Sequence, residues 1–136
     1  MKAETHLIHT PEEMHLLGKH LATKHKILFL EWELWAWKTT FAKGFAEWLG
    51  IHPDKVQSPT YTYINIYEEN LLHIDLLRIQ EFEQLVQKGI IEEIQNFSHI
   101  LIEWPKYTEH LPLIETVTVT IKKTSPTSRE VIVIKS

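Results

Sequence analysis

The sequence predicts an α/β fold with three layers, in which helices cover a central, mostly parallel sheet that carries β-hairpin additions. Two short runs, 27–30 and 99–103, have apolar centres, which is typical of strands buried on both faces, and a carboxylate ends or follows each one. Segments with the 3.6-residue helical period precede and separate these runs. Two other regions, 61–75 and 117–134, alternate around turn residues and therefore predict hairpins.

The first predicted helix has a clear start signal. Thr10 is its expected N-cap, Pro11 takes the first helical position, and Glu13 completes a capping box. Apolar residues then share one face up to about Thr23, namely Met14, Leu17 and Leu21.

A second helix is predicted from about Thr39 to Leu49. Phe41 and Phe45 stand four residues apart on its buried side, and Gly50 is a natural C-terminal stop. Further along the chain the same kinds of signal predict a hairpin of strands 61–67 and 71–75 about a turn at 68–70, helices near 82–88 and 91–94, and a C-terminal hairpin of strands 117–121 and 131–134 about a turn at 125–127.

Length and composition are those of one ordinary globular domain, residues 1–136. Charged residues make up 24% and hydrophobic residues 43% of the chain, which excludes wholesale disorder. The lack of cysteine excludes disulfides and thiolate zinc sites and fits a cytoplasmic protein. A formal charge of −4 argues against a chain that grips nucleic acid by itself. With no signal-peptide pattern and no apolar run near ~18 residues, we expect a soluble protein with no membrane partner.

Residues 26–40 have the outline of a phosphate-binding loop, GxxxxGK[ST], which favours a P-loop NTPase-like fold. In such a loop, backbone N–H groups surround the phosphates, the lysine neutralises their charge, and the hydroxyl reaches Mg2+. Lys38 and Thr39 stand where the motif requires them, but Trp32 and Trp37 occupy its two glycine positions.

A third tryptophan, Trp35, stands where many such loops also carry glycine. Glycine allows the backbone a positive φ and a close approach to an anion, and we expect an indole to forbid both. The cradle of N–H groups should therefore not form in this chain. The opposing interpretation, that the tryptophans stack on a base, does not replace the lost N–H groups.

Several polar residues have the right chemistry for phosphoryl transfer. A lysine at a helix N-terminus stabilises phosphate charge, a hydroxyl and a carboxylate hold magnesium, and a second carboxylate orients or deprotonates water. The alternative is a plain helix start and two strands that end in solvated acids. The candidates are Lys38, Thr39, Thr40, Asp75, Glu103 and Trp104, with Ser58-Pro59-Thr60 and His73 nearby.

The histidines and the small basic clusters give weaker signals. Among nine histidines only His6 and His9 are closely spaced, and no acidic cluster accompanies them, so we expect no structural metal site. The clusters 24–26 and 122–123 are expected to be solvated surface and not an RNA site.

The chain resembles the bacterial TsaE (YjeE) family of P-loop ATPases, which act in tRNA threonylcarbamoyladenosine biosynthesis. The family pattern is a strand, then G-[DE]-L-G-A-G-K-T-T, a segment like S-P-T-[YF]-T, then H-x-D-L-x-R, and a strand that ends in L-I-E-W-[PA]. The matching residues span nearly the whole chain: Glu33-Leu34, Ala36, Lys38-Thr39-Thr40, Ser58 to Thr62, His73 to Arg78, and Leu101 to Pro105.

The resemblance implies an ATPase that binds a complex of TsaD and TsaB and resets it by hydrolysing ATP, while the partner holds the tRNA. It implies that Lys38 contacts the β and γ phosphates, that Thr39 and Glu103 hold Mg2+, and that Asp75 serves the water or the metal. Residues 58–62 would act as a switch segment. The implied ATP-binding residues are Trp32, Glu33, Leu34, Trp35, Ala36, Trp37, Lys38, Thr39, Thr40 and Trp104.

The departure from the family is the replacement of glycine by tryptophan. Trp32, Trp35, Trp37 and Trp48 all stand at positions where the family commonly has glycine, whereas Trp104 matches a family tryptophan. The chain has four glycines, although average usage predicts about ten. A single type of replacement at unrelated positions motivates the hypothesis that these codons are UGA, read as glycine in a host with a reassigned genetic code.

Two other functions are compatible with these residues. A nucleotide-free module could have lost its phosphate loop and kept the surface that docks TsaD, but intact Asp75 and Glu103 argue against this. A small-molecule kinase is disfavoured because we recognise no lid and no second substrate motif.

The codon hypothesis makes a direct prediction. Sequencing the gene should find UGA at positions 32, 35, 37 and 48, and the codon at Trp104 is the internal comparison. UGG at all four positions would exclude the hypothesis and make the tryptophans genuine.

Overall fold

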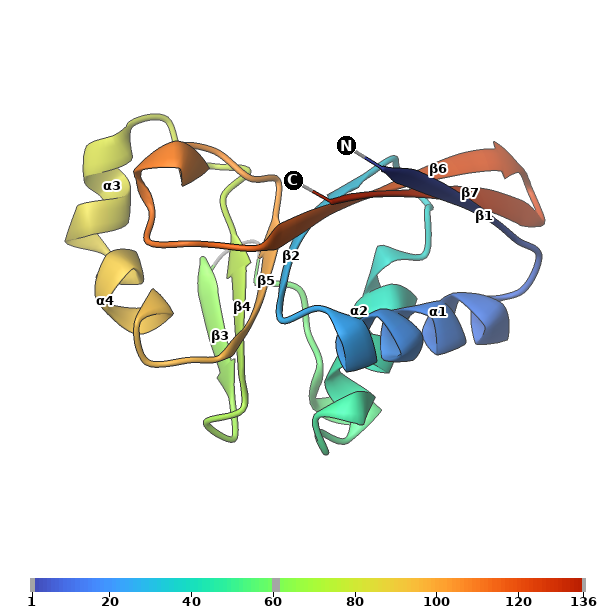
Figure 1. Cartoon of the computed structure of the whole chain (residues 1–136), viewed down its shortest axis with the longest axis horizontal. Helices are drawn as coiled ribbons and strands as arrows, with labels where there is room; N and C mark the ends of the chain where they lie inside the picture. Colours follow the sequence, from blue (N-terminus) through green and yellow to red (C-terminus); the bar gives the residue numbers. More distant parts are fainter. Residues whose placement is uncertain (1, 60–61, 136) are drawn as a thin grey trace.

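The computed structural model describes residues 2–59 and 62–135, and its centre is a mixed sheet (Figure 1). Within these residues the sheet has seven strands in the order β1-β7-β6-β2-β5-β4-β3. Strand β2 lies parallel to β5 and β6, and β5 lies parallel to β4. The strands are β1 Ala3–Ile8, β2 Ile27–Trp32, β3 Ile64–Tyr67, β4 Leu71–Asp75, β5 His99–Glu103, β6 Thr116–Ser125 and β7 Ser128–Lys135.

Helices cover both faces of the sheet and make the predicted three layers (Figure 1). Successive strand residues point to opposite faces, so Leu28 and Leu30 of β2 pack in one apolar cluster with residues of α1 and α2. Ile100 and Ile102 of β5 pack in the other cluster, with residues of α3 and α4. The helices are α1 Pro11–Lys24, α2 Lys38–Trp48, α3 Phe82–Gln87 and α4 Ile90–Ile94, with 3₁₀ turns at Pro53–Lys55 and Thr108–His110.

The α/β fold with a parallel centre and added hairpins is confirmed. Strands β3 and β4 form one antiparallel hairpin, and β6 and β7 form the other. Gly50 and Gly89 follow α2 and α3 with positive φ, as glycines at helix ends do. Within residues 2–59 and 62–135, no helix is both long and apolar enough to cross a membrane.

The start of α1 differs from the predicted capping box in one contact. The Thr10 hydroxyl accepts the Glu13 N–H at 3.1 Å, as predicted. The Glu13 carboxylate, however, accepts the N–H of His9 at 2.8 Å and not that of Thr10. The carboxylate therefore reaches one residue further back than in the usual motif.

Strand boundaries account for the other differences. Strand β2 runs to Trp32, two residues beyond the prediction, because β6 pairs with it as far as Ile121. Strand β3 begins at Ile64, after Tyr63 with φ of 67°, and not at residue 61. Thr60 and Tyr61 lie outside the described residues. Strand β1 was not predicted, because Ile8 is its one buried residue and its sequence shows no clear alternation.

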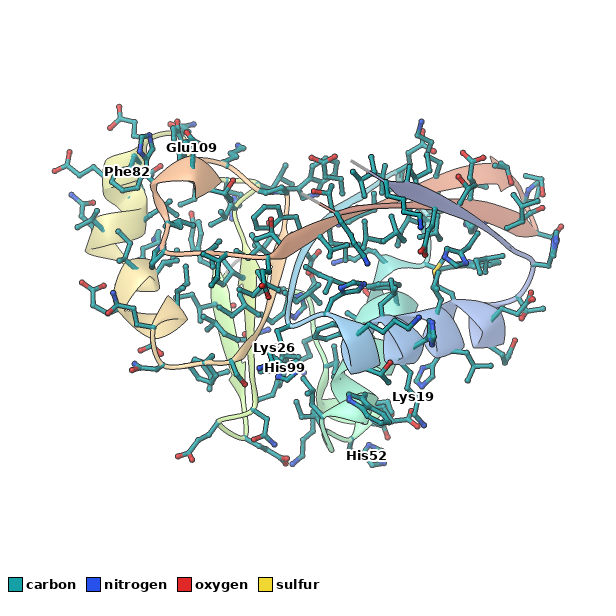
Figure 2. The ribbon with its side chains drawn as sticks, in the orientation of Figure 1. Lys19, Lys26, His52, Phe82, His99 and Glu109 are labelled. Carbon is teal, nitrogen blue, oxygen red and sulfur yellow. The ribbon has the colours of Figure 1, made fainter. Side chains whose placement is uncertain are left out.

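Two glycines allow α1 and α2 to approach each other closely. A Cβ at Gly18 would lie 2.2 Å from the carbonyl oxygen of Phe41, and a Cβ at Gly44 would lie 1.9 Å from that of His15. Lys19, which is labelled in Figure 2, adds an ion pair from α1 to Glu47 of α2 at 3.2 Å. This contact between helices sets the position of α2 and so the position of the residues at its N-terminus.

We expect Gly44→Ala to lower the free energy of unfolding by about 3 kcal/mol, although alanine is the better helix former, because its methyl group would overlap backbone that cannot move away. Urea denaturation measures the change. The control is His20→Ala, on the exposed side of α1. An unchanged denaturation midpoint for Gly44→Ala would show that the two helices are not so closely packed.

Candidate functional site

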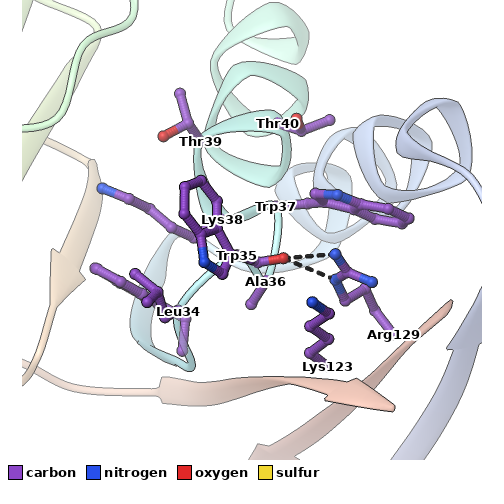
Figure 3. Close-up of a pocket in the computed structure, with 10 residues that line it drawn as sticks. Leu34, Trp35, Ala36, Trp37, Lys38, Thr39, Thr40, Lys123 and Arg129 are labelled. Carbon is purple, nitrogen blue, oxygen red and sulfur yellow. Dashed lines mark hydrogen bonds between the residues drawn. The ribbon is translucent and has the colours of Figure 1, made fainter. Parts of the chain in front are cut away.

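The carboxyl ends of β2, β4 and β5 lie at one edge of the sheet because these strands are parallel. Parallel sheets of this kind bind ligands at that edge. A pocket of about 520 Å³ opens there (Figure 3). It is lined by Trp32, Leu34, Trp35, Ala36, Trp37, Lys38, Thr39, Thr40, Lys123 and Arg129. Glu33, Asp75, Glu103 and Trp104 are not among these lining residues.

The loop between β2 and α2 adopts the backbone that favours glycine, despite its indoles. The N–H of Ala36 donates to the carbonyl of Glu33 at 3.1 Å, which closes a turn with Trp35, φ 64°, at its third position. A turn with positive φ at that position normally carries glycine or asparagine. Trp37 is the N-cap of α2 with φ 66° and ψ 33°. The expectation that an indole forbids positive φ was therefore wrong. Left-handed backbone costs a bulky residue about 1–2 kcal/mol, which the surrounding contacts must offset.

The three indoles of the loop point in different directions. Trp32 donates its ring N–H to Glu103 at 3.2 Å and packs against Trp104 with 5.4 Å between ring centroids. Trp35 is 71% exposed and lies beside the pocket (Figure 3). Trp37 lies under the guanidinium of Arg129, 3.8 Å from it. Large apolar rings therefore stand where a phosphate loop would present bare backbone.

Glu103 is the electrostatic centre of the site. It is fully buried, and its carboxylate accepts from Lys38 at 2.9 Å and contacts His73 Nε2 at 2.5 Å. Burial alone would raise the pKa of Glu103, but the hydrogen bonds and charges of His73 and Lys38 outweigh it and lower that pKa. Lys38 also donates to the Ser58 hydroxyl at 2.8 Å.

Asp75 lies next to Glu103 across the sheet. The two residues are paired in the register of β4 and β5, and Asp75 is 2% exposed. Its carboxylate accepts the N–H of Leu77 at 2.9 Å, which holds it at the end of its strand. The structure therefore brings together the lysine and the two acids that the sequence singled out.

The other predicted residues lie around this centre. Thr39 and Thr40 are in the first turn of α2, where backbone N–H groups have no partner within the helix. Trp104 directly follows β5 with φ 54°, and within the described residues its ring N–H is buried without a hydrogen-bond partner. Glu33 faces the C-terminal hairpin, where its carboxylate accepts the N–H of Lys123 at 2.9 Å.

Two residues of the C-terminal hairpin were not predicted as part of this site. Arg129 is buried and lines the pocket, and Lys123, expected only to be solvated surface, is exposed and also lines it. For Arg129, the alternation of buried and exposed residues in β7 carries a signal in the sequence. Counting back by two from Val133 and Val131 puts an arginine on the buried face, where a hydrocarbon would be expected.

The other basic cluster, residues 24–26, lies at the opposite end of the sheet. Figure 2 shows Lys26 and His99 close together where β2 and β5 begin.

Within residues 2–59 and 62–135, no group of three or more His, Cys, Asp or Glu side chains could hold a metal ion.

The fold and the site define an α/β protein with a loop between β2 and α2, a lysine at the first position of α2, and two acids at the neighbouring strand ends. The family model described as "Threonylcarbamoyl adenosine biosynthesis protein TsaE" matches residues 8–131. The chain therefore belongs to the TsaE family.

Relatives and a solved structure agree with this assignment. The chain is 38% identical over 128 residues to the tRNA threonylcarbamoyladenosine biosynthesis protein TsaE of Bacillus subtilis, covering 89% of this chain and 78% of the relative. It is 33% identical over 119 residues to the protein of the same name from Rickettsia conorii, covering 81% and 67%. The crystal structure of Bacillus subtilis YdiB superposes with a TM-score of 0.74 at 28% identity, covering 98% of this chain and 86% of that one.

The low pKa of Glu103 predicts how stability depends on pH. The pKa of Glu103 in the folded protein lies below its ordinary value of 4.5. The ionised carboxylate therefore contributes fully to the free energy of unfolding above pH 4.5, and this contribution is lost as the pH falls through the folded-state pKa. Glu103→Gln should lower the free energy of unfolding at pH 7 by about 1.5–3 kcal/mol, the range of a hydrogen bond to a charged group. In acid, the free energy of unfolding of this variant should depend less on pH than that of the unaltered chain.

Urea denaturation between pH 7 and pH 3 measures both effects. The exposed Glu12→Gln is the matched control and should follow the unaltered chain. Equal acid sensitivity in the unaltered chain and in Glu103→Gln would contradict the assigned ion pairs.

Proposed function

We propose that this protein is the ATP-binding and ATP-hydrolysing subunit of the machinery that makes threonylcarbamoyladenosine in tRNA, and that it resets a complex of TsaD and TsaB in the cytoplasm. The observation that carries the proposal is the Lys38–Glu103 pair, 2.9 Å apart at the N-terminus of α2, with Asp75 beside it. A lysine, a helix N-terminus and two acids at one sheet edge are the parts that phosphoryl transfer requires.

Each residue of the site has a distinct role in the proposed reaction. Lys38 and the first N–H groups of α2 bind the β and γ phosphates of ATP, since both offer positive charge at the pocket. Asp75, at the end of β4, orients the attacking water or accepts its proton. Trp104 flanks the site through its contact with Trp32.

The residues present fit a magnesium ion bound together with nucleotide. Mg2+ usually takes one or two protein ligands and completes its shell with phosphate oxygens and water, so a large acidic cluster is not needed. Thr39 would supply its hydroxyl and Glu103 its carboxylate. When bound, the ion would neutralise charge that builds up on the phosphates. Without nucleotide, the Glu103 carboxylate is bonded to Lys38, His73 and Trp32, so Lys38 must leave it to reach a phosphate.

The tryptophans decide whether this polypeptide performs that function. Trp35 and Trp37 take positive φ, for which glycine is the suitable residue, and this supports the codon hypothesis for the natural protein. With glycine at these positions the loop would keep its backbone and lose the rings that stand at the pocket. The polypeptide with tryptophan is expected not to bind ATP.

The proposed partners follow from the family and from the charge of the chain. A formal charge of −4 is unfavourable for direct contact with tRNA, so the partner proteins would hold the RNA. TsaD and TsaB are therefore the expected contacts, and tRNA is reached only through them.

The second candidate function is a nucleotide-free module that docks the same partners. Leu34 and Trp35 favour it, because these apolar side chains are 70% and 71% exposed at the tip of the loop. Exposed apolar groups of this kind occur at sites of protein contact. The placement of Asp75 beside Glu103 at the strand ends favours the ATPase, since a module without nucleotide has little use for two neighbouring carboxylates there.

We predict no saturable binding when this chain is titrated with ATP and Mg2+ in a calorimeter, because indole rings line the pocket where a phosphate loop presents bare backbone N–H groups. The variant with Trp32→Gly, Trp35→Gly and Trp37→Gly should bind ATP. Trp48→Gly is the matched control, because Trp48 lies at the far end of α2 and its replacement should restore nothing. Tight ATP binding by the unaltered chain would refute this account of the loop.

A hydrolysis assay on the triple variant, with and without TsaD and TsaB, then separates the two candidate functions. Phosphate release that depends on the loop glycines supports the ATPase. Partner binding without any nucleotide binding or hydrolysis, even with glycine in the loop, would establish the docking module instead.

A further inference from the structure

Arg129 connects the C-terminal hairpin to the loop between β2 and α2. Its guanidinium donates two hydrogen bonds to the carbonyl of Trp35, at 2.9 Å from Nε and 2.6 Å from Nη2 (Figure 3). Its third nitrogen donates to the carbonyls of Ser125 and Ser128, at 2.9 and 2.8 Å. The side chain is 2% exposed. A buried guanidinium with every nitrogen bonded is held in one orientation, and it holds its acceptors in turn.

The hairpin is built so that this arginine reaches the loop. The register of β6 and β7 shifts between Lys123 and Ser125, and the Ser125 and Ser128 hydroxyls are 2.7 Å apart across the turn. Arg129 follows this turn on the face of β7 that also carries Val131. Its side chain therefore leaves the apolar layer at the end where the loop lies.

The contact with Trp35 determines which way one peptide group of the loop faces. With the carbonyl of residue 35 bound to Arg129, its oxygen faces the C-terminal hairpin, and the charge of the guanidinium offsets its negative dipole. The next N–H, that of Ala36, is held by the Glu33 carbonyl on the other side of the same peptide. The carbonyl of residue 35 and the N–H of Ala36 are both backbone groups. The hydrogen bonds from Arg129 to that carbonyl therefore do not depend on whether residue 35 is tryptophan or glycine.

We propose that Arg129 is a positioning residue for the loop between β2 and α2: it holds the carbonyl of residue 35 against the C-terminal hairpin and so keeps the loop in its curved shape before any nucleotide arrives. The consequence for ATP rests on the proposed function, whereas the ordering of the loop does not. A second contact from the same hairpin, the N–H of Lys123 to Glu33, fixes the beginning of the loop in the same way.

Hydrogen exchange without nucleotide tests the proposal directly. In Arg129→Lys and Arg129→Met, the N–H of Ala36 should exchange about tenfold faster, the change expected when a charged hydrogen bond is lost. The N–H groups of β5 serve as an internal reference for global unfolding. Lys122→Met is the matched control, because Lys122 is exposed on the same hairpin and does not line the pocket.

The two replacements separate positioning from packing. Methionine fills much of the volume of arginine without its donors, and lysine keeps the charge but cannot make the paired contact with the carbonyl. If Arg129 only fills space, Arg129→Met should leave the exchange of Ala36 as in the control, and the proposal would be overturned. Equal acceleration in the loop and in β5 would also overturn it, because the effect would then be global.

The same substitutions in the triple glycine variant test the consequence for the ligand. Arg129→Met should weaken ATP binding about tenfold, while Lys122→Met should leave it unchanged. If the triple variant binds no ATP at all, the proposed function fails, and the exchange measurement still decides the role of Arg129. If the loop exchanges faster and ATP binding stays unchanged, the link between loop order and affinity is refuted.

Discussion

The buried carboxylate of Glu103 is the constraint on which the site depends. A buried charge is costly unless it is paired, and Glu103 is paired with His73 of β4 and with Lys38 of α2. These contacts connect two strands and the helix that begins at the loop. The same carboxylate accepts from Trp32 at the end of β2, so three parallel strands and α2 meet at one charged group. The pocket opens beside this group and shares Trp32 and Lys38 with it.

The loop beside this centre combines a suitable backbone with unsuitable side chains. Its turn places positive φ at Trp35 and again at Trp37, so its course is that of a glycine-rich loop. The rings are accommodated outside the backbone, against Trp104, under the guanidinium of Arg129 or in solvent. Contacts from both neighbours hold this course: the close packing of α1 on α2 sets the helix start, and the C-terminal hairpin binds the loop carbonyl. The shape of the loop is therefore imposed by its surroundings more than by its own residues.

Sequence patterns were sufficient for the elements that have strong local signals. Thr10 and Pro11 marked the start of α1, and the apolar runs marked β2 and β5. They were insufficient for β1, an exposed edge strand that is stabilised by pairing with β7 and not by its own alternation. In the site, Lys38, Asp75 and Glu103 could be chosen because their residue types and their positions at element ends are informative. Arg129 could not be connected with the loop, since 94 residues separate it from Trp35 and only the sheet order brings them together.

The sequence by itself determined the α/β class, the loop between a buried strand and a helix, and the two acids at strand ends, because each of these follows from a local pattern of apolar and polar residues. Only the tertiary structure decided that Glu103 binds both His73 and Lys38, that the indoles tolerate a left-handed backbone, and that the last hairpin holds the loop. The physical reason is that these contacts join residues far apart in the chain. Their energies depend on burial and on the register of neighbouring strands, and neither is encoded in any short segment.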